Sequence, residues 1–536
     1  MLRRIILLGV LVLAGTAQVC AQVKSDLRIS GKTVNAVTGQ PLSHTEVSIG
    51  KAEQFDVVLQ RVLTGDDGGF AFAGLQSGKY WLAAQRNGFR KQGYEEHGAY
   101  ASAIVTGQGI VSDHLIFRVR PDAWIAGTVT NEETEPVPNA AITLFRTDAS
   151  AGFTRNFQLA QVLTDDRGYY RFAHLESGRY FVVVSAQPWF SSLTWPQRLS
   201  GVNLPSDEKT LFDVVYPTTF YPGVTDPSSA SPVVVNAGEG FTADVILAAV
   251  PALQVVVRNV YSDPEHARGA NLEQRVFGVP IRPPSQEEKM VDDAVEISGL
   301  PPGKYELNVQ SYGPVPSVRS TMIDLVTNME TDANNAAASP TVRGIVQMDG
   351  EHGALPQVFV RLWNARGGEM LDAQIVDKGK FSFDLGFLVP GDYFVFAMSG
   401  ENSILSRLSA KGAKVVGQSI QVSGLTPIIL NIGLSQTLSK INGTAKRNGQ
   451  SFPGAMIVLV PDHPENNLPL FRRDQSDSDG TFTLRDVLPG HYKIVAIENG
   501  WDLEWADPTI LKTRFDHAES VDIQPNMTYQ TTVDVE

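Results

Sequence analysis

Histidines and acidic residues are the first side chains to test for chemistry, because together they bind zinc and transfer protons. The chain has 536 residues and nine histidines. None of these has a glutamate three residues later, and His463 and His517 each precede a glutamate at the wrong spacing. No serine-hydrolase elbow, phosphate-binding loop or dinucleotide fingerprint occurs. The sequence therefore predicts no catalytic residue and no cofactor.

Acidic turns could bind calcium, which takes about six to eight oxygen ligands from a preformed loop. The densest group lies between Asp474 and Gly480, where Asp477 and Asp479 alternate ahead of the glycine. The bidentate glutamate that completes a calcium loop is missing from this stretch. Asp477 and Asp479 are therefore weak calcium candidates, and a hairpin turn without metal is the alternative interpretation.

Aromatic rings could stack on sugars, with nearby carboxylates bonding the sugar hydroxyl groups. Two stretches have this composition, an insertion at 188–232 and a segment at 499–508, where Asp502 and Glu504 alternate with tryptophans. The alternative is that these rings attach loops to the protein's own core. The candidate carbohydrate-stacking residues are Trp189, Trp195, Tyr221, Trp501 and Trp505.

A repeated pattern indicates which elements position these residues. It consists of a hydrophobic residue, two further residues, a glycine, any residue and a tyrosine, followed by an alternating strand. Length alone predicts three or four domains at roughly 150 residues each, whereas the tyrosines recur about every 103 residues and give five units. The five tyrosines are Tyr80, Tyr180, Tyr305, Tyr393 and Tyr492.

Two further markers precede each tyrosine. An Asp/Gly turn leads into a strand with aromatic residues at alternate positions, as at 67–72 and 166–172. About 40 residues earlier, the first strand of four units contains a glycine. Period-two alternation buries one face of a strand, and short strands between turns are typical of a sandwich. The predicted fold class is all-β, as tandem antiparallel β-sandwiches.

This set of markers resembles the carboxypeptidase regulatory-like family. The resemblance implies seven-stranded sandwiches of the prealbumin (transthyretin-like) type, Ig-like in appearance and akin to Cna-B-like adhesin repeats and starch-binding-domain-like folds. It is poorest in the third unit, where Val255–Val257 lacks the glycine and Val295–Ile297 replaces the aromatic strand. The zinc motif of the family's catalytic domains is missing, and five units leave no room for such a domain, so a protein that is not an enzyme is expected.

The stretches 221–227 and 501–508 also resemble large exported repeat proteins of soil acidobacteria, which implies a bacterial origin. The markers predict domains at 22–120, 121–250, 251–337, 338–434 and 435–536. The polar stretch 328–340 predicts a flexible joint between the third and fourth units. A short helix is predicted at 507–513, because Pro508 suits a first helical turn.

The N-terminus has the layout of a secretory signal peptide at 1–21, with two arginines, an apolar run and small residues before a cleavage site. Cys20, the single cysteine, would leave with it. Lipidation of Cys20 is the less favoured alternative, because Val19 rather than a small residue precedes it. The signal predicts export to the periplasm, the outer cell surface or the medium. No later apolar run is long enough to span a membrane.

The net charge of −14 argues against a nucleic-acid partner. These features predict a non-enzymatic exported binding or scaffold protein, whose partner is a polysaccharide or an envelope or extracellular protein. Several weak sites held apart by rigid sandwiches would add by avidity. The alternatives are a structural spacer like an adhesin stalk and, less favoured, a metal-dependent hydrolase with an unrecognised site.

Overall fold

The computed structural model describes residues 27–54, 57–191, 213–260, 268–311, 317–349, 357–364, 370–377, 382–388, 390–400, 403–424 and 426–536. Within these ranges the regular secondary structure is almost all β-strand, with a single five-residue α-helix. The all-β fold prediction is confirmed. The predicted signal peptide and Trp195 lie outside the described residues.

The first unit shows the plan of the sandwiches. One sheet has the order β4–β1–β8, and the other has the order β3–β2–β5–β6 with β7 beside a second stretch of β5. The unit has the seven strand positions of the predicted sandwich, because β6 and β7 occupy the same edge position, each beside a different stretch of β5. The strands are β1 (Leu27–Asn35), β2 (Glu46–Lys51), β3 (Gln60–Leu63), β4 (Gly69–Leu75), β5 (Gly78–Arg86), β6 (Phe89–Gly93), β7 (Ile104–Thr106) and β8 (Leu115–Val119).

The second and third units repeat this plan with extra short strands. The second unit has β9 (Ala123–Thr130), β10 (Ala141–Asp148), β11 (Arg155–Leu163), β12 (Tyr169–Leu175), β13 (Gly178–Ser185), β14 (Val214–Val215), β15 (Thr219–Phe220), η1 (Pro227–Ser229), β16 (Val233–Val235), β17 (Gly240–Thr242), β18 (Val245–Ile246) and β19 (Val250–Pro251). The third has β20 (Leu253–Arg258), β21 (Arg268–Val276), β22 (Val279–Ile281), β23 (Glu287–Val291), β24 (Ala294–Leu300), β25 (Gly303–Ser311), β26 (Ser317–Leu325), β27 (Met329–Asp332), η2 (Ala333–Asn335) and β28 (Ala337–Ala338).

In the fourth unit, β35 pairs with both β34 and β38 and joins the two sheets into one. Its strands are β29 (Thr341–Met348), β30 (Val358–Trp363), β31 (Met370–Asp372), β32 (Gln374–Asp377), β33 (Ser382–Phe387), β34 (Gly391–Ser399), β35 (Ile404–Lys411), β36 (Lys414–Val416), β37 (Ser419–Val422) and β38 (Ile428–Ser435). The fifth has β39 (Ser439–Arg447), β40 (Gln450–Ser451), β41 (Met456–Pro461), η3 (Pro464–Asn466), η4 (Leu468–Leu470), β42 (Arg472–Gln475), β43 (Thr481–Val487), β44 (Gly490–Ile497), η5 (Gly500–Asp502), α3 (Pro508–Lys512), η6 (Phe515–His517), β45 (Glu519–Ile523) and β46 (Thr528–Asp534).

The first strand of each unit takes part in parallel pairing within otherwise antiparallel sheets, and in the second unit both β17 and β18 pair with it in this way. The first strand pairs in parallel with the closing strand, as β1 with β8, β9 with β17, β20 with β27, β29 with β38 and β39 with β46. Parallel neighbours need a long connection rather than a hairpin. Here that connection is the rest of the sandwich, which fixes the two ends of each unit side by side.

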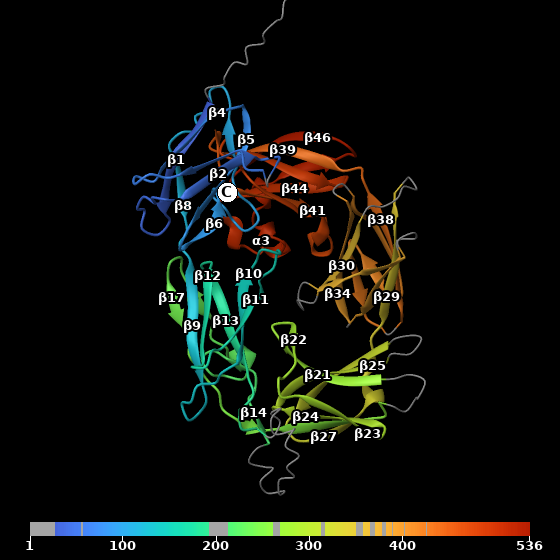
Figure 1. The fold of residues 1–536 in the computed structure, drawn as a ribbon. Coiled ribbons are helices and arrows are strands. Elements are labelled where there is room, and N and C mark those ends of the chain that lie inside the picture. Colours follow the sequence, from blue (N-terminus) through green and yellow to red (C-terminus); the bar gives the residue numbers. More distant parts are fainter. Residues whose placement is uncertain are drawn as a thin grey trace, which may run out of the picture.

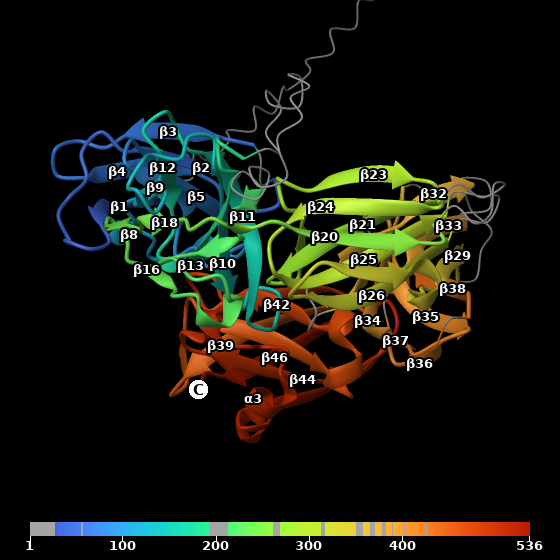
Figure 2. The same ribbon diagram turned by 90° about the horizontal axis from the view of Figure 1, so that it is seen from below.

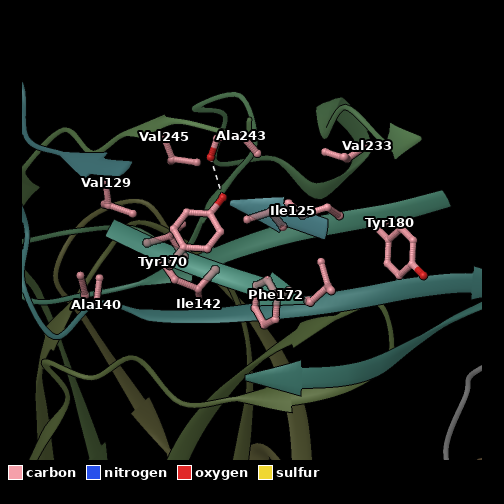
Figure 3. Packing of buried hydrophobic residues seen from close by; sticks show 14 of the residues in the cluster. Ile125, Val129, Ala140, Ile142, Tyr170, Phe172, Tyr180, Val233, Ala243 and Val245 are labelled. Carbon is pink, nitrogen blue, oxygen red and sulfur yellow. Dashed lines mark hydrogen bonds between the residues drawn. The ribbon is translucent and has the colours of Figure 1, made fainter. Parts of the chain in front are cut away.

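The glycine of the first strand lies opposite an aromatic residue in the neighbouring strand. Gly31 pairs with Phe70, Gly127 with Tyr170, Gly344 with Phe383 and Gly443 with Phe482. In the second unit the Tyr170 hydroxyl donates to the carbonyl of Ala243 at 2.5 Å, as Figure 3 shows. A Cβ on Gly127 would lie 2.2 Å from that same carbonyl oxygen. The glycine therefore makes room for the closing strand and the ring together.

The third unit lacks both partners of this pair and replaces them together. Val257 lies where the other units have glycine, and it pairs with Val295 where they have the aromatic residue. Both valines are buried in the core of the unit. Two medium-sized valine side chains thus fill the space that one large aromatic ring, opposite a glycine, fills in the other units. The summed volume of the two paired side chains is thus roughly conserved, which explains why the glycine marker and the aromatic marker are both missing from the same unit.

The flexible joint predicted at 328–340 is wrong. Residues 329–332 form β27, the closing strand that pairs with β20, and 333–335 form η2, capped by the Asp332 side chain. Asn259 also donates to the Asp332 carboxylate at 2.7 Å. The polar composition therefore reflects a closing edge strand rather than a linker. The helix predicted at 507–513 is confirmed as α3, with Asp507 as its N-cap.

Each unit has its own hydrophobic core. We propose that the five units are the five domains predicted from the repeat. Figure 1 shows the sandwiches in a closed arrangement, with the first (blue) beside the fifth (red). Figure 2 shows the fifth unit along one side of the molecule, between the first two units and the fourth.

Two apolar contacts fix neighbouring units. Phe277, at the tip of the β21–β22 hairpin, packs on the second unit with ring centroids 4.9 Å from Phe181 and 5.2 Å from Phe145. Rings of the fourth unit, including Trp363 and Phe396, share a buried cluster with β41 and β44 of the fifth. The units are therefore packed on one another as well as linked in sequence.

Candidate functional site

The fifth unit contacts the first through the turn between β42 and β43, which we call the 474–481 turn. The Asp477 carboxylate accepts the backbone N–H of Ala103 at 2.9 Å and forms an ion pair with Lys79. The Lys79 ammonium also donates to the Thr481 hydroxyl at 2.9 Å. Ser478 exchanges hydrogen bonds with the backbone around β7. The turn therefore adds to the edge of the first sandwich.

Gln475 is the most connected side chain of this contact and is fully buried. Its amide nitrogen donates to the Glu95 carbonyl at 2.7 Å and to the Ser102 hydroxyl at 2.8 Å. Its amide oxygen lies 3.1 Å from Nδ1 of His97. Buried polar groups cost free energy unless they are hydrogen-bonded, so these satisfied groups favour one docking geometry.

Burial sets the protonation of the acidic groups at this contact. It raises the pKa of Asp474 to about 6, although Asp474 accepts the backbone N–H groups of Thr483 and Gln475. Burial also raises the pKa of Asp477, and Lys79 opposes that change. The pKa of His97 is lowered by burial. The interface thus favours a neutral His97, and burial penalises charge on both aspartates.

The structure separates Trp501 from Trp505, which the sequence grouped. Trp501 stacks on His97 of the first unit with ring centroids 4.9 Å apart and planes within 5°. Trp505 is only 8% exposed and packs against Phe471, with the Arg473 guanidinium 4.0 Å from its ring centroid. Both tryptophans therefore contribute to contacts between units, and they do not form one open platform.

A loop of the second unit covers Trp505. The Gly152 carbonyl accepts the N–H of Ala506 at 3.1 Å, and Glu504 accepts the N–H of Thr154 at 2.8 Å. Arg473 donates to the Ser150 carbonyl at 3.0 Å. The segment 499–508 is therefore where the second unit meets the fifth, and Glu504 acts as a partner of that loop.

Among the described residues of the second unit's insertion, one aromatic ring is open to solvent. Trp189 is 71% exposed and meets Phe190 edge to face, with centroids 5.7 Å apart. Tyr221 is partly buried and packs against Phe241 and the core. Of the two, only Trp189 offers most of its surface to solvent.

The weak calcium candidates have protein partners. Asp477 binds Lys79 and Ala103, and Asp479 accepts the N–H and hydroxyl of Thr481 at 3.0 and 2.6 Å. Within the part of the chain that the structure describes, no group of three or more His, Cys, Asp or Glu residues could hold a metal. The carboxylate oxygens are thus engaged in a turn and an interface.

Sequence reasoning singled out the 474–480 stretch but missed Gln475, Lys79, Ser102 and His97. Gln475 and Ser102 are 373 residues apart. The available signal was a stretch richer in carboxylates and amides than a hairpin turn requires. A local sequence pattern cannot predict a contact between residues so far apart, because periodicity indicates only which residues share a face of one strand or helix.

These units define a class of repeated β-sandwich domains. Residues 28–104 and 124–210 each match the family model of the carboxypeptidase regulatory-like domain. The first two units therefore match this family, which confirms the resemblance there. A search of curated proteins finds no significant match.

Several solved structures match this chain at low identity. The Bacillus anthracis TIE protein is 9% identical, and the match covers 94% of this chain and 73% of that one, with a TM-score of 0.17. A streptococcal ancillary pilin is 13% identical over 53% of this chain and 98% of its own, with a TM-score of 0.18. The Bacillus cereus major pilin BcpA is 11% identical over 77% and 99%, with a TM-score of 0.14.

No helix among the described residues has the length and apolar character needed to cross a membrane.

Proposed function

We propose that this chain is a non-enzymatic, exported scaffold that holds several loops in one fixed arrangement for a protein partner at the cell envelope or outside it. The observation that supports this most directly is the contact of the 474–481 turn with the first unit. Gln475, Asp477 and Lys79 bond across a sequence separation of more than 370 residues. Such a contact closes the chain on itself.

A closed arrangement distinguishes a scaffold from an extended spacer. In a stalk, each sandwich contacts only its neighbours in sequence, so that the end-to-end length of the molecule grows with the number of sandwiches. Here the fifth unit also bonds to the first and second units. These contacts make the molecule shorter than an extended chain of sandwiches and fix the relative positions of the exposed loops. Fixed loops suit simultaneous binding at several points.

Small-angle X-ray scattering tests this proposal. A compact chain of this length has a radius of gyration of about 24 Å, whereas five sandwiches laid end to end would have roughly 50 Å. We expect a value within about 8 Å of the compact limit, unchanged by dilution. A value near the extended limit would favour the stalk. Chelator-sensitive turnover in a broad hydrolase screen would instead favour an enzyme.

Carbohydrate binding is a second candidate, and the exposed Trp189 is the observation that favours it. We expect any sugar found on a glycan array to lose most of its binding in Trp189→Ala and to keep it in Trp81→Ala, a tryptophan of the first unit. An empty array, or equal binding by both variants, would remove this candidate.

A further inference from the structure

A cavity of about 480 Å³ lies where the second, fourth and fifth units meet. Its wall is mainly apolar, and the second unit contributes Ala151 from the loop that covers Trp505. Ligand sites in proteins favour such junctions between domains and have volumes of roughly 300 to 1,000 Å³. The apolar side chains that matter most are Trp363, Phe396, Met398, Leu405, Phe471 and Trp505.

Three buried polar atoms belong to side chains that line this cavity. They are the indole nitrogens of Trp363 and Trp505 and the amide oxygen of Gln418, on residues that are 5%, 8% and 7% exposed. Within the described residues none of the three atoms has a hydrogen-bond partner. The amide nitrogen of Gln418, by contrast, donates to the Leu405 carbonyl at 2.8 Å, which fixes the side chain. An indole nitrogen only donates and an amide oxygen only accepts.

The charged groups on the wall already have partners. Arg472 donates through Nε and Nη2 to the Asp486 carbonyl, at 3.0 and 2.7 Å, and through Nη1 to the carbonyls of Pro469 and Phe471. Asp486 also lines the cavity and offsets the Arg472 charge at longer range. A charged ligand would face both signs while losing its hydration, which is costly. The unmatched groups are all neutral.

We propose that this cavity binds an uncharged, largely aromatic molecule that carries a hydroxyl group or a similar donor–acceptor oxygen. The ring system would pack among Trp363, Phe396 and Trp505. Because the three polar atoms are covered by neighbouring side chains, small movements of these neighbours on binding would let an indole N–H donate to the ligand's oxygen and let Gln418 accept from its hydroxyl. Because three units form the wall, the same ligand would hold the closed arrangement together. This site goes beyond the scaffold function and does not depend on it.

Equilibrium dialysis with three matched probes tests the site on the full chain. The probes are 2-naphthol, its isostere 2-methylnaphthalene and the anion 2-naphthoate. We expect one saturable site for 2-naphthol, with at least tenfold weaker binding of the other two, since one well-placed buried hydrogen bond is worth about a factor of ten. Absence of saturable 2-naphthol binding to folded protein, or equal binding of all three probes, would overturn the proposal.

Variants locate the site. Trp363→Phe and Trp505→Phe keep a ring but remove the N–H, so at least one should reduce the preference for 2-naphthol over 2-methylnaphthalene to below threefold. Met398→Trp should weaken both probes by filling the rim, because Met398 lines the cavity and is half exposed. Trp189→Phe is the control and should change neither. If Trp505→Phe fails to fold by circular dichroism, Trp363→Phe and Met398→Trp decide. Unchanged binding in every folded cavity variant would contradict the assignment.

Discussion

Two tryptophans that the sequence could not distinguish have opposite roles in the structure. Trp505 is buried under a loop of the second unit and against Phe471, whereas Trp189 is mostly exposed. The apolar area removed from water sets most of the energetic value of such a ring. The same residue type therefore stabilises the protein in one place and remains free for a ligand in the other.

Replacing Trp505 with alanine should destabilise the protein strongly. Loss of a buried tryptophan costs about 3–5 kcal/mol, because the cavity that remains cannot fully collapse. Trp189→Ala is the matched control and should stay within about 0.5 kcal/mol of the parent. Urea denaturation followed by far-ultraviolet circular dichroism measures both. Equal stability of the two variants would show that Trp505 is not packed as described.

The pH dependence of stability should report the buried carboxylate of Asp474. Burial raises its pKa from 3.8 to about 6, so the folded chain binds this proton more tightly than the unfolded chain. The contribution of Asp474 to stability therefore rises as the pH falls from about 6 towards 4, by roughly 3 kcal/mol at most. Asp474→Asn removes this dependence.

The measurement is the difference in unfolding free energy between parent and Asp474→Asn at pH 7 and at pH 4.5. The unfolding free energy of the parent, relative to that of Asp474→Asn, should be higher at pH 4.5 than at pH 7. This holds whatever the difference between the two chains is at pH 7. Other titrating groups, such as His97, affect both chains alike to first order. A difference that is constant with pH, or that moves in the opposite direction, would contradict the buried state of Asp474.

At the scale of strands, one cross-strand pair connects the repeat markers to the packing of each sandwich. A Cβ on Gly443 would lie 2.2 Å from the ring of Phe482. The third unit has valine at both corresponding positions, Val257 and Val295. The two markers are therefore one packing unit, and a change in either requires a change in the other.

A double-mutant cycle in the fifth unit should reveal this coupling. Gly443→Val overpacks the core and Phe482→Val leaves a cavity, so each should cost about 2 kcal/mol or more. The double variant copies the third unit and should cost at least about 1 kcal/mol less than the sum of the two. Gly443→Val combined with Ile523→Val, on the other sheet, should be additive. An additive result for the first pair would contradict shared packing.

At the scale of the whole molecule, the contact between the first and fifth units keeps the arrangement closed. Asp477→Lys would place a second cation against Lys79 in a buried contact and remove the acceptor of the Ala103 N–H. Like charges brought together away from water repel strongly. We expect the radius of gyration to rise by at least several ångströms while each sandwich stays folded.

Asp66→Lys is the control for this charge reversal, since Asp66 lies in an exposed turn of the first unit. It should leave the scattering curve unchanged. Added salt should not close the Asp477→Lys variant fully, because screening is weak for buried pairs. An Asp477→Lys chain as compact as its parent would show that the 474–481 turn does not hold the units together.

The sequence alone determined the all-β fold, the repeated sandwich and the short helix predicted at 507–513, because periodicity, turn residues and caps act within a few residues of one another. It also marked Asp477, Trp501 and Trp505 as unusual. It misjudged 328–340, since a polar edge strand and a linker have similar composition. Only the tertiary structure decided what these residues do. Gln475 meets Ser102, and Trp501 meets His97, across most of the chain. Such contacts depend on how finished sandwiches pack, and no local pattern encodes that packing.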